Sequence, residues 1–284
     1  MSELACHLAA LYLHPVKSCG GIAIDEALLI ETGLDLDRAW MVVDADGRML
    51  TQRQLPRMAL IRPTLRGSDL VLRAPGMLAL HVSLEAVEAE TRARVWDDEV
   101  KAYDMGALAS QWFSDFLGRP GTRLVRFDPE QRRLSDPAWT GSTEAENAFS
   151  DGFPLLVCST GSLAELNRRL AAAGAAPVTM DRFRPNLVLD GLEAHDEDAL
   201  ERITIETAEG PVRLRLVKPC TRCGIPNVDP MSGVASNEPG LTLAGYRADA
   251  RLDGAITFGV NAVIEAGFDC VLRVGQSAAG EWRF

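Results

Sequence analysis

The sequence has no long hydrophobic run. No stretch approaches the roughly 20 consecutive apolar residues that a helix needs to cross a bilayer. Residues 1–7 carry neither the basic segment nor the long apolar segment of a secretory signal. These absences predict a cytoplasmic protein that makes no contact with a membrane.

Several signatures of cofactor and metal binding are also missing. No Gly-x-Gly-x-x-Gly follows a strand-like run, which argues against a flavin or nicotinamide fold. No cysteine set has the spacing of a plant-type iron–sulfur cluster, and no second Cys-x-x-Cys or close histidine pair completes a four-ligand zinc site. The formal net charge of −11 argues against nucleic-acid binding by bulk electrostatics.

The chain is long enough for two hydrophobic cores. It has 284 residues, of which 47% are apolar, and its six cysteines are scattered apart from one close pair. That distribution does not form the framework of a small disulfide-rich domain and suits a reducing compartment. We expect two domains, at residues 1–125 and 126–284.

Short apolar runs broken by turn residues fill the first hundred residues. They predict β-strands rather than long helices, with a hairpin at residues 44–47. The runs lie at residues 11–13, 22–30, 40–43, 70–72 and 78–82. We therefore expect a barrel-like or sandwich-like β-domain, and a mainly β fold with some α (α+β) for the whole chain.

Helical spacing appears twice. Leu108, Trp112, Phe113 and Phe116 predict an amphipathic linker helix, followed by a turn-rich connection at residues 128–148. In the second half, residues 149–157 predict a turn leading into a buried strand. The Ser-Leu-Ala-Glu at residues 162–165 has the spacing of a capping box, with leucines at 163, 166 and 170 on one helix face.

Three polar stretches stand out in the first domain. In residues 14–21, Lys17 and Ser18 precede two glycines, so this loop is either an ordinary turn or an anion cradle. Arg38 comes just before an apolar strand, where an arginine is more often a surface charge. Thr51-Gln-Arg-Gln54 predicts only a solvated face.

One close cysteine pair, Cys220-x-x-Cys223, follows a strand-like run and precedes a turn-rich segment. A thioredoxin-type dithiol needs a helix directly after its first cysteine, and Pro226 and Pro230 argue against one. Two interpretations stay open: two buried structural cysteines, or a single thiolate that holds a soft, redox-active metal.

Several motifs resemble one family, in the same order along the chain. Pro219-Cys-Thr-Arg-Cys223, followed by Val-Asp-Pro at 228–230, is similar to the signature of the molybdenum cofactor sulfurase C-terminal (MOSC) family. Phe-Arg-Pro-Asn at 183–186 and Thr-Phe-Gly-Val-Asn at 257–261 are similar to further stretches of it. The resemblance extends over about residues 7–280 and is greatest to two-part members such as the mitochondrial amidoxime-reducing component and its bacterial relatives.

The resemblance implies an N-terminal β-barrel domain followed by a β-barrel MOSC domain. It also implies a bound molybdenum cofactor (Mo-molybdopterin). It implies that Cys223 is the metal ligand and the catalytic residue. The implied cofactor-binding residues come from both halves of the chain: Lys17, Ser18, Arg38, Gly152, Phe153, Arg184, Thr221, Arg222 and Asn261.

The resemblance also implies a function. The chain would reduce small N-oxygenated compounds, such as N-hydroxylated bases, with electrons from a separate flavodoxin-, ferredoxin- or cytochrome-type protein. The alternative is a carrier of the molybdenum cofactor, or of a persulfide on Cys223, without reductase activity of its own. Zinc, flavin and an iron–sulfur cluster in this chain are not expected.

Overall fold

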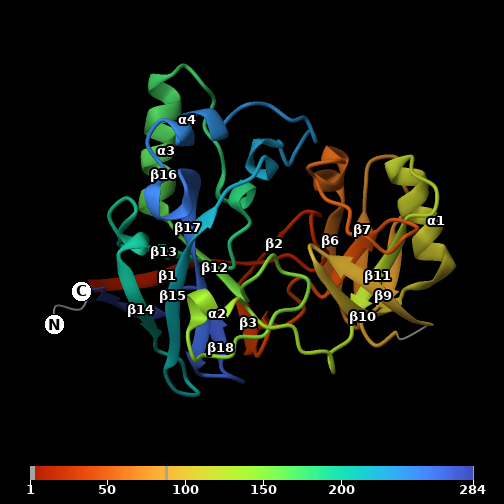
Figure 1. The fold of residues 1–284 in the computed structure, drawn as a ribbon, viewed down its shortest axis with the longest axis horizontal. Coiled ribbons are helices and arrows are strands. Elements are labelled where there is room, and N and C mark those ends of the chain that lie inside the picture. Colours follow the sequence, from red (N-terminus) through yellow and green to blue (C-terminus); the bar gives the residue numbers. More distant parts are fainter. Residues whose placement is uncertain (1–3, 87–88, 284) are drawn as a thin grey trace.

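The computed structural model describes residues 4–86 and 89–283. The chain forms two lobes that lie side by side, with segments of the chain passing between them (Figure 1). The larger lobe contains both described ends of the chain and most of the second half of the sequence. Strands dominate both lobes, which confirms the predicted mainly β fold with helices at the periphery.

The larger lobe is built on a closed β-barrel of seven strands. They follow one another around the wall, and pairing of the last with the first closes it. Leucine, isoleucine and valine side chains that alternate along these strands fill the interior, as period-two burial requires. In wall order the strands are β12 (Leu155–Ser159), β13 (Leu187–Asp190), β1 (Leu4–Leu13), β19 (Ser277–Trp282), β14 (Leu200–Ile205), β15 (Val212–Thr221) and β17 (Ala255–Ala266).

Shorter elements surround the barrel. The longest is α3 (Thr160–Ala172), which packs Leu166 and Leu170 against the outside of the wall in a separate apolar cluster. The others are β2 (Ile22–Ile24), β3 (Glu26–Ile30), β4 (Gly33–Leu34), α2 (Pro137–Thr140), α4 (Gly240–Ala244), β16 (Ala248–Asp249) and β18 (Val271–Arg273). Single-turn 3₁₀ helices join them: η2 (Met180–Phe183), η3 (Asp196–Asp198), η4 (Ile225–Asn227) and η5 (Ala250–Leu252).

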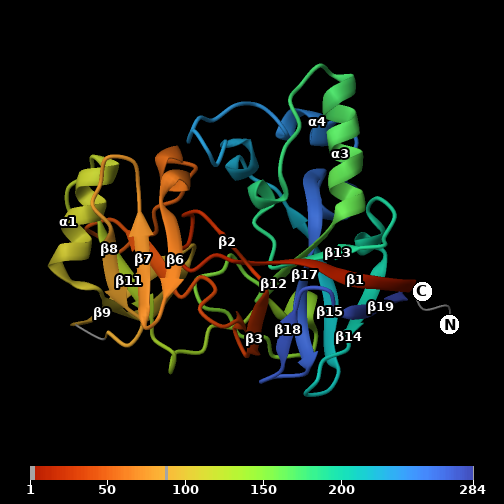
Figure 2. The ribbon, with the colours of Figure 1, turned by 180° about the vertical axis from the view of Figure 1, so that it is seen from behind.

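The smaller lobe contains two antiparallel sheets with a helix packed on them (Figure 2). One sheet has the order β5 (Trp40–Val43), β11 (Arg123–Phe127), β10 (Asp98–Asp104) and β9 (Ala89–Val95). The other has β6 (Arg62–Arg66), β7 (Asp69–Arg73) and β8 (Leu80–Ser83), preceded by the 3₁₀ helix η1 (Pro56–Leu60). Helix α1 (Gly106–Leu117) buries Trp112, Phe113 and Phe116 in the core of this lobe.

Both predicted helices exist, with differences in detail. Helix α1 is confirmed, but Leu108 is 74% exposed and does not belong to its buried face. The predicted capping box is wrong for α3, because the helix begins three residues earlier. Its N-cap is Ser159, whose hydroxyl oxygen accepts a hydrogen bond from the backbone N–H of Ser162 at 3.1 Å.

The barrel takes its strands from both ends of the chain. Strand β1 lies between β13 and β19 and pairs antiparallel with each. The first described residues therefore belong to the larger lobe, although the predicted first domain began with them. No helix in residues 4–86 and 89–283 is long and apolar enough to span a membrane.

Candidate functional site

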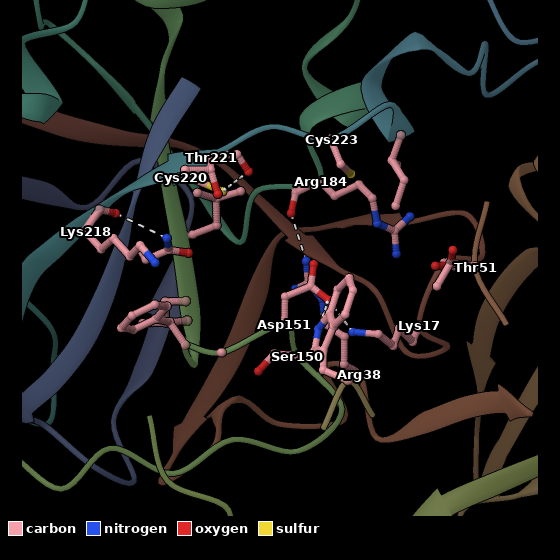
Figure 3. Close-up of a pocket in the computed structure, with 18 of the residues that line it drawn as sticks. Lys17, Arg38, Thr51, Ser150, Asp151, Arg184, Lys218, Cys220, Thr221 and Cys223 are labelled. Carbon is pink, nitrogen blue, oxygen red and sulfur yellow. Dashed lines mark hydrogen bonds and ion pairs between the residues drawn. The ribbon is translucent and has the colours of Figure 1, made fainter. Parts of the chain in front are cut away.

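A large cavity lies between the two lobes, with a volume of about 870 Å³. All ten residues predicted for the site line it, although the first and last of them are more than two hundred residues apart in sequence. Figure 3 labels Lys17, Arg38, Arg184, Thr221 and Cys223 among them. They are Lys17, Ser18, Arg38, Gly152, Phe153, Arg184, Thr221, Arg222, Cys223 and Asn261. The structure thus brings every predicted residue to one place.

Lys17 is buried at the wall of this cavity, in the loop that follows β1. Its ammonium group donates hydrogen bonds to the carbonyl oxygen of Phe149 at 2.7 Å and to the carboxylate of Asp151 at 2.5 Å. Burial lowers the pKa of the Lys17 ammonium, while Asp151 opposes that effect. Ser18, beside it, has a left-handed backbone with φ 63°, which turns the loop toward Gln52.

Two arginines contact each other across the site. Arg38 Nη2 donates to the carbonyl oxygen of Arg184 at 2.9 Å, and Arg38 Nη1 donates to Asn186 at 3.1 Å and to Asp37. Arg184 itself donates through Nη1 to the carbonyl oxygen of Cys19. Burial, followed by repulsion from Arg38, lowers the pKa of Arg184 to about 10.

The second nitrogen of that guanidinium has no partner. Arg184 Nη2 is buried and makes no hydrogen bond with any described residue. An unpartnered buried donor on a charged group is unfavourable by about 1–3 kcal/mol or more. A cationic donor without a hydrogen-bond partner in a residue that lines a cavity is typical of an anion-binding site, because a bound anion would accept the missing hydrogen bond.

The turn at residues 149–153 is held rigidly against the cavity. Arg133, which is 8% exposed, donates through Nη1 to the carbonyl oxygens of Ala148 at 3.1 Å and Ser150 at 2.8 Å. Its Nε donates to Asp98 at 2.7 Å, which ties the turn to β10 of the smaller lobe. Gly152 accepts a further hydrogen bond from Asn147 at 3.3 Å. This turn carries Gly152 and Phe153 to the cavity.

The cysteine pair lies where β15 ends. The Cys223 side chain is exposed, whereas Cys220 is half-buried and accepts a hydrogen bond at Sγ from Arg222 Nη1 at 3.0 Å. Arg222 also donates to the carbonyl oxygen of Phe183 at 2.9 Å. The interpretation as two buried structural cysteines is therefore wrong for Cys223, because its thiol faces the cavity and solvent.

Asn261, on β17, faces the cavity from the far side. Its amide nitrogen donates to the carbonyl oxygen of Lys218 at 3.2 Å, which leaves its amide oxygen available to a ligand. The ammonium group of Lys218 lies 5.0 Å from the ring centroid of Trp139, a cation–π contact that extends the polar wall.

The smaller lobe adds residues that the sequence did not predict. Thr51 and Gln52 were expected on a solvated face, but they are only 1% and 5% exposed, and Thr51 lines the cavity. Arg53 also lines it and stacks on Trp96 at 4.5 Å, and Trp96 donates to Asp151 at 3.2 Å. No local pattern indicates these positions, because only the packing of the two lobes brings them to the site.

The site can hold a large anionic molecule and a soft metal at the same time. Lys17, Arg38 and Arg184 supply a positive region at one end, which suits a phosphate monoester. Cys223 supplies an exposed sulfur donor at the other, which suits a soft metal. No group of three or more His, Cys, Asp or Glu among the described residues is arranged to hold a metal without further ligands.

Two family models match most of the chain. The MOSC N-terminal beta barrel domain matches residues 5–120, and the MOSC domain matches residues 144–279. The chain belongs to the MOSC-domain proteins. The resemblance predicted from the motifs is confirmed.

This MOSC protein is similar over most of its length to curated relatives. It is 34% identical over 251 residues to rat mitochondrial amidoxime reducing component 2, which covers 84% of this chain and 72% of the relative. It is 37% identical over 249 residues to human mitochondrial amidoxime-reducing component 1, with the same shares of 84% and 72%. Human molybdenum cofactor sulfurase is 30% identical over 285 residues, which covers 94% of this chain and 31% of the sulfurase.

Proposed function

We propose that this MOSC protein is a molybdenum-cofactor-dependent reductase of small N-oxygenated compounds. One observation carries the proposal: the same cavity is lined by Cys223, whose thiol is exposed, and by Arg184, whose buried Nη2 has no partner among the described residues. A thiolate ligand for the metal and a cationic cradle for a pterin phosphate are the two features that such a cofactor needs. The names of the amidoxime-reducing relatives support the same assignment.

The residues present fit the cofactor. Arg184 Nη2 is a buried donor with no described partner, and a phosphate oxygen would give it one. Lys17 and Arg38 line the same cavity, and their side chains would offer a phosphate the compact charge of an ammonium and the planar donor set of a guanidinium. A cavity of about 870 Å³ also leaves space for a small substrate next to a bound pterin.

Each residue then has a distinct role. When bound, the cofactor supplies two-electron redox chemistry at molybdenum. Lys17, Ser18, Arg38 and Arg184 would hold its phosphate. The turn at Gly152 and Phe153 would contact the pterin, together with Thr221, Arg222 and Asn261. Cys223 gives the metal its protein ligand.

The overall reaction determines how many electrons and protons the protein must receive. Reduction of an N-hydroxylated compound breaks the N–O bond, consumes two electrons and two protons, and releases the oxygen as water. We propose that the electrons come from a separate flavodoxin-, ferredoxin- or cytochrome-type protein. We also propose a cytoplasmic location. Along the sequence we propose domains at residues 1–125 and 126–284, the first of which contributes strand β1 to the barrel of the larger lobe.

The alternative is a carrier that holds the cofactor or a persulfide for another enzyme. The exposure of Cys223 and the similarity to a molybdenum cofactor sulfurase favour it as the second candidate. The two functions differ in metal content and in turnover: a persulfide carrier needs no stoichiometric molybdenum, and neither carrier reduces a substrate.

Anaerobic purification, metal analysis and a reductase assay separate these functions. We expect about one molybdenum per chain, and reduction of benzamidoxime to benzamidine with dithionite-reduced methyl viologen as the donor. NADH or NADPH alone should support no turnover. Sulfane sulfur on Cys223 without molybdenum would identify a persulfide carrier, and molybdenum without substrate reduction would identify a cofactor carrier.

A further inference from the structure

Five arginines lie close together in the sequence of the smaller lobe, and none of them forms an ion pair within the described part of the chain. They are Arg53, Arg57, Arg62, Arg66 and Arg73. Asp69 is the only carboxylate between positions 53 and 73, and it lies 3.2 Å from His81. Several exposed arginines elsewhere are paired, for example Arg92 with Glu99 at 2.8 Å and Arg168 with Glu165 at 2.7 Å.

The strand pairing concentrates these charges on one face. In the β6–β7 hairpin, Arg62 lies directly opposite Arg73. Arg66 lies four residues from Arg62 on the same side of the strand and directly opposite Asp69. Like charges directly opposite one another destabilise a sheet. We call these three arginines, together with Arg57 of the preceding η1, the arginine face. In a chain of net charge −11, this face is a local positive region that an acidic partner would neutralise.

An exposed apolar segment of the larger lobe lies against this face. We call residues 229–234, which follow η4, the strap. Arg62 donates to the carbonyl oxygen of Pro230, and an added Cβ at Gly233 would lie 3.1 Å from Leu60 and 3.6 Å from Arg57. Both views show the segment after β15 reaching toward the smaller lobe beside the start of β6 (Figures 1 and 2).

The strap carries large apolar side chains in solvent. Met231 is 80% exposed and Val234 is 62% exposed. Apolar side chains with charged groups at their edge are the usual composition of a protein interface. The strap also begins a few residues after Cys223, and η4, which precedes it, lines the cavity through Ile225. The exposed apolar segment is therefore continuous with the wall of the proposed redox site.

We propose that the arginine face and the strap form the docking surface for a small acidic electron-transfer protein, which delivers the two electrons of each turnover near Cys223. This inference rests on the proposed reductase function. The charge of the face selects an acidic partner and steers its approach, and Met231 and Val234 provide the short-lived contact. Redox encounters of this kind are small in area and weak, so charge contributes mainly to the association rate.

A triple substitution tests the surface, with a matched control. Arg57→Gln, Arg66→Gln and Arg73→Gln together remove three charges from the face, and none of these residues lines the cavity. The control is Arg92→Gln, Arg168→Gln and Arg251→Gln, which removes three charges from ion-paired arginines elsewhere. Arg62 is retained in both variants because it holds the strap.

The holoenzymes are compared with two acidic donors, reduced flavodoxin and reduced cytochrome b5, and with methyl viologen. We expect the face variant to lose roughly tenfold or more of the bimolecular rate with at least one protein donor at low ionic strength. The difference should shrink in high salt. The rate with methyl viologen should stay unchanged, and the control should stay within about twofold of the wild type. Equal losses in both variants, or no loss in either, would overturn the proposal.

Direct binding separates this proposal from the function on which it rests. If the wild type reduces no substrate with methyl viologen, the reductase function fails, and surface plasmon resonance with the same two proteins still tests docking. Saturable, salt-sensitive binding that only the face variant loses supports the surface, and absence of binding to both proteins overturns it. Sedimentation with phosphatidylserine vesicles tests whether the arginine face binds an anionic membrane instead of an acidic protein. Vesicle binding lost by the face variant, with protein binding unchanged, would assign the face to an anionic membrane instead.

Discussion

At the scale of single residues, Cys223 is the position on which the proposed chemistry depends. Cys223→Ala should abolish reduction of benzamidoxime with methyl viologen, because no neighbouring side chain can replace a soft sulfur donor. Its thiol is exposed, so its removal opens no cavity and the thermal midpoint should stay unchanged. Cys220→Ala is the matched control and should retain most activity. An inactive Cys220 variant beside an active Cys223 variant would mean that the ligand assignment is wrong.

Arg184 should control how tightly the cofactor is held. Arg184→Gln removes a charged donor, and a hydrogen bond to a charged group contributes about 1.5–3 kcal/mol, so affinity for the cofactor should fall roughly ten- to a hundredfold. The measurement is the pterin that the protein retains after gel filtration. Arg182→Gln is the control, since Arg182 is paired with Asp229 at 3.1 Å and does not line the large cavity. Equal retention by both variants would exclude a role for Arg184 in binding.

At the scale of elements, the start of α3 depends on a buried polar cluster. Ser159 caps the helix and donates to the carboxylate of Glu197 at 2.8 Å, while Ser162 donates to the same carboxylate at 2.6 Å. Ser159→Ala should lower the free energy of unfolding in urea by about 2–4 kcal/mol, because it removes both the cap and a hydrogen bond to a buried charge. Ser68→Ala, in the exposed β6–β7 turn, should change it by less than about 0.5 kcal/mol.

The same cluster should make stability depend on pH. Burial raises the pKa of Glu197, with hydrogen bonds from Ser162 and Ser159 opposing this effect. Between the ordinary carboxyl pKa of about 4.3 and the raised value, the folded chain binds more protons than the unfolded chain, so stability falls as the pH rises. In urea unfolding at pH 4 to 8, the free energy of unfolding of Glu197→Gln should therefore increase relative to that of the wild type as the pH rises. A constant difference between the two would contradict the raised pKa.

The sequence predicted local features better than the contacts between distant elements. The aromatic spacing in residues 108–116 predicted α1, because helical burial repeats over a few residues. The ten site residues were found through short motifs, although nothing local shows that Lys17 and Cys223 share a cavity. Thr51 and Gln52 were misjudged, since polar residues look solvated until another lobe covers them. The place of β1 in the barrel wall depends on pairing across nearly the whole chain.

At the scale of the whole molecule, a cofactor in this cavity would join the two lobes. Thr51 and Arg53 belong to the smaller lobe, whereas Lys218 and Asn261 belong to the barrel. The holo form should therefore be more stable than the apo form, by about 2.7 kcal/mol when free cofactor is a hundred times its Kd. The measurement is the thermal midpoint before and after cofactor removal. Arg184→Gln should reduce this difference between its own holo and apo forms, and equal midpoints of the wild-type forms would contradict binding between the lobes.

The pairing of β1 with β19 also sets an order for biosynthesis. The strand near the beginning of the described chain cannot complete its pairing until the strand near the end has left the ribosome. At about 5–20 residues per second, that delay is on the order of tens of seconds. During it, the smaller lobe can form around its own apolar clusters, because residues 40–127 supply both of its sheets and α1. The smaller lobe would thus fold while the barrel is still open, and closure of the barrel wall would follow.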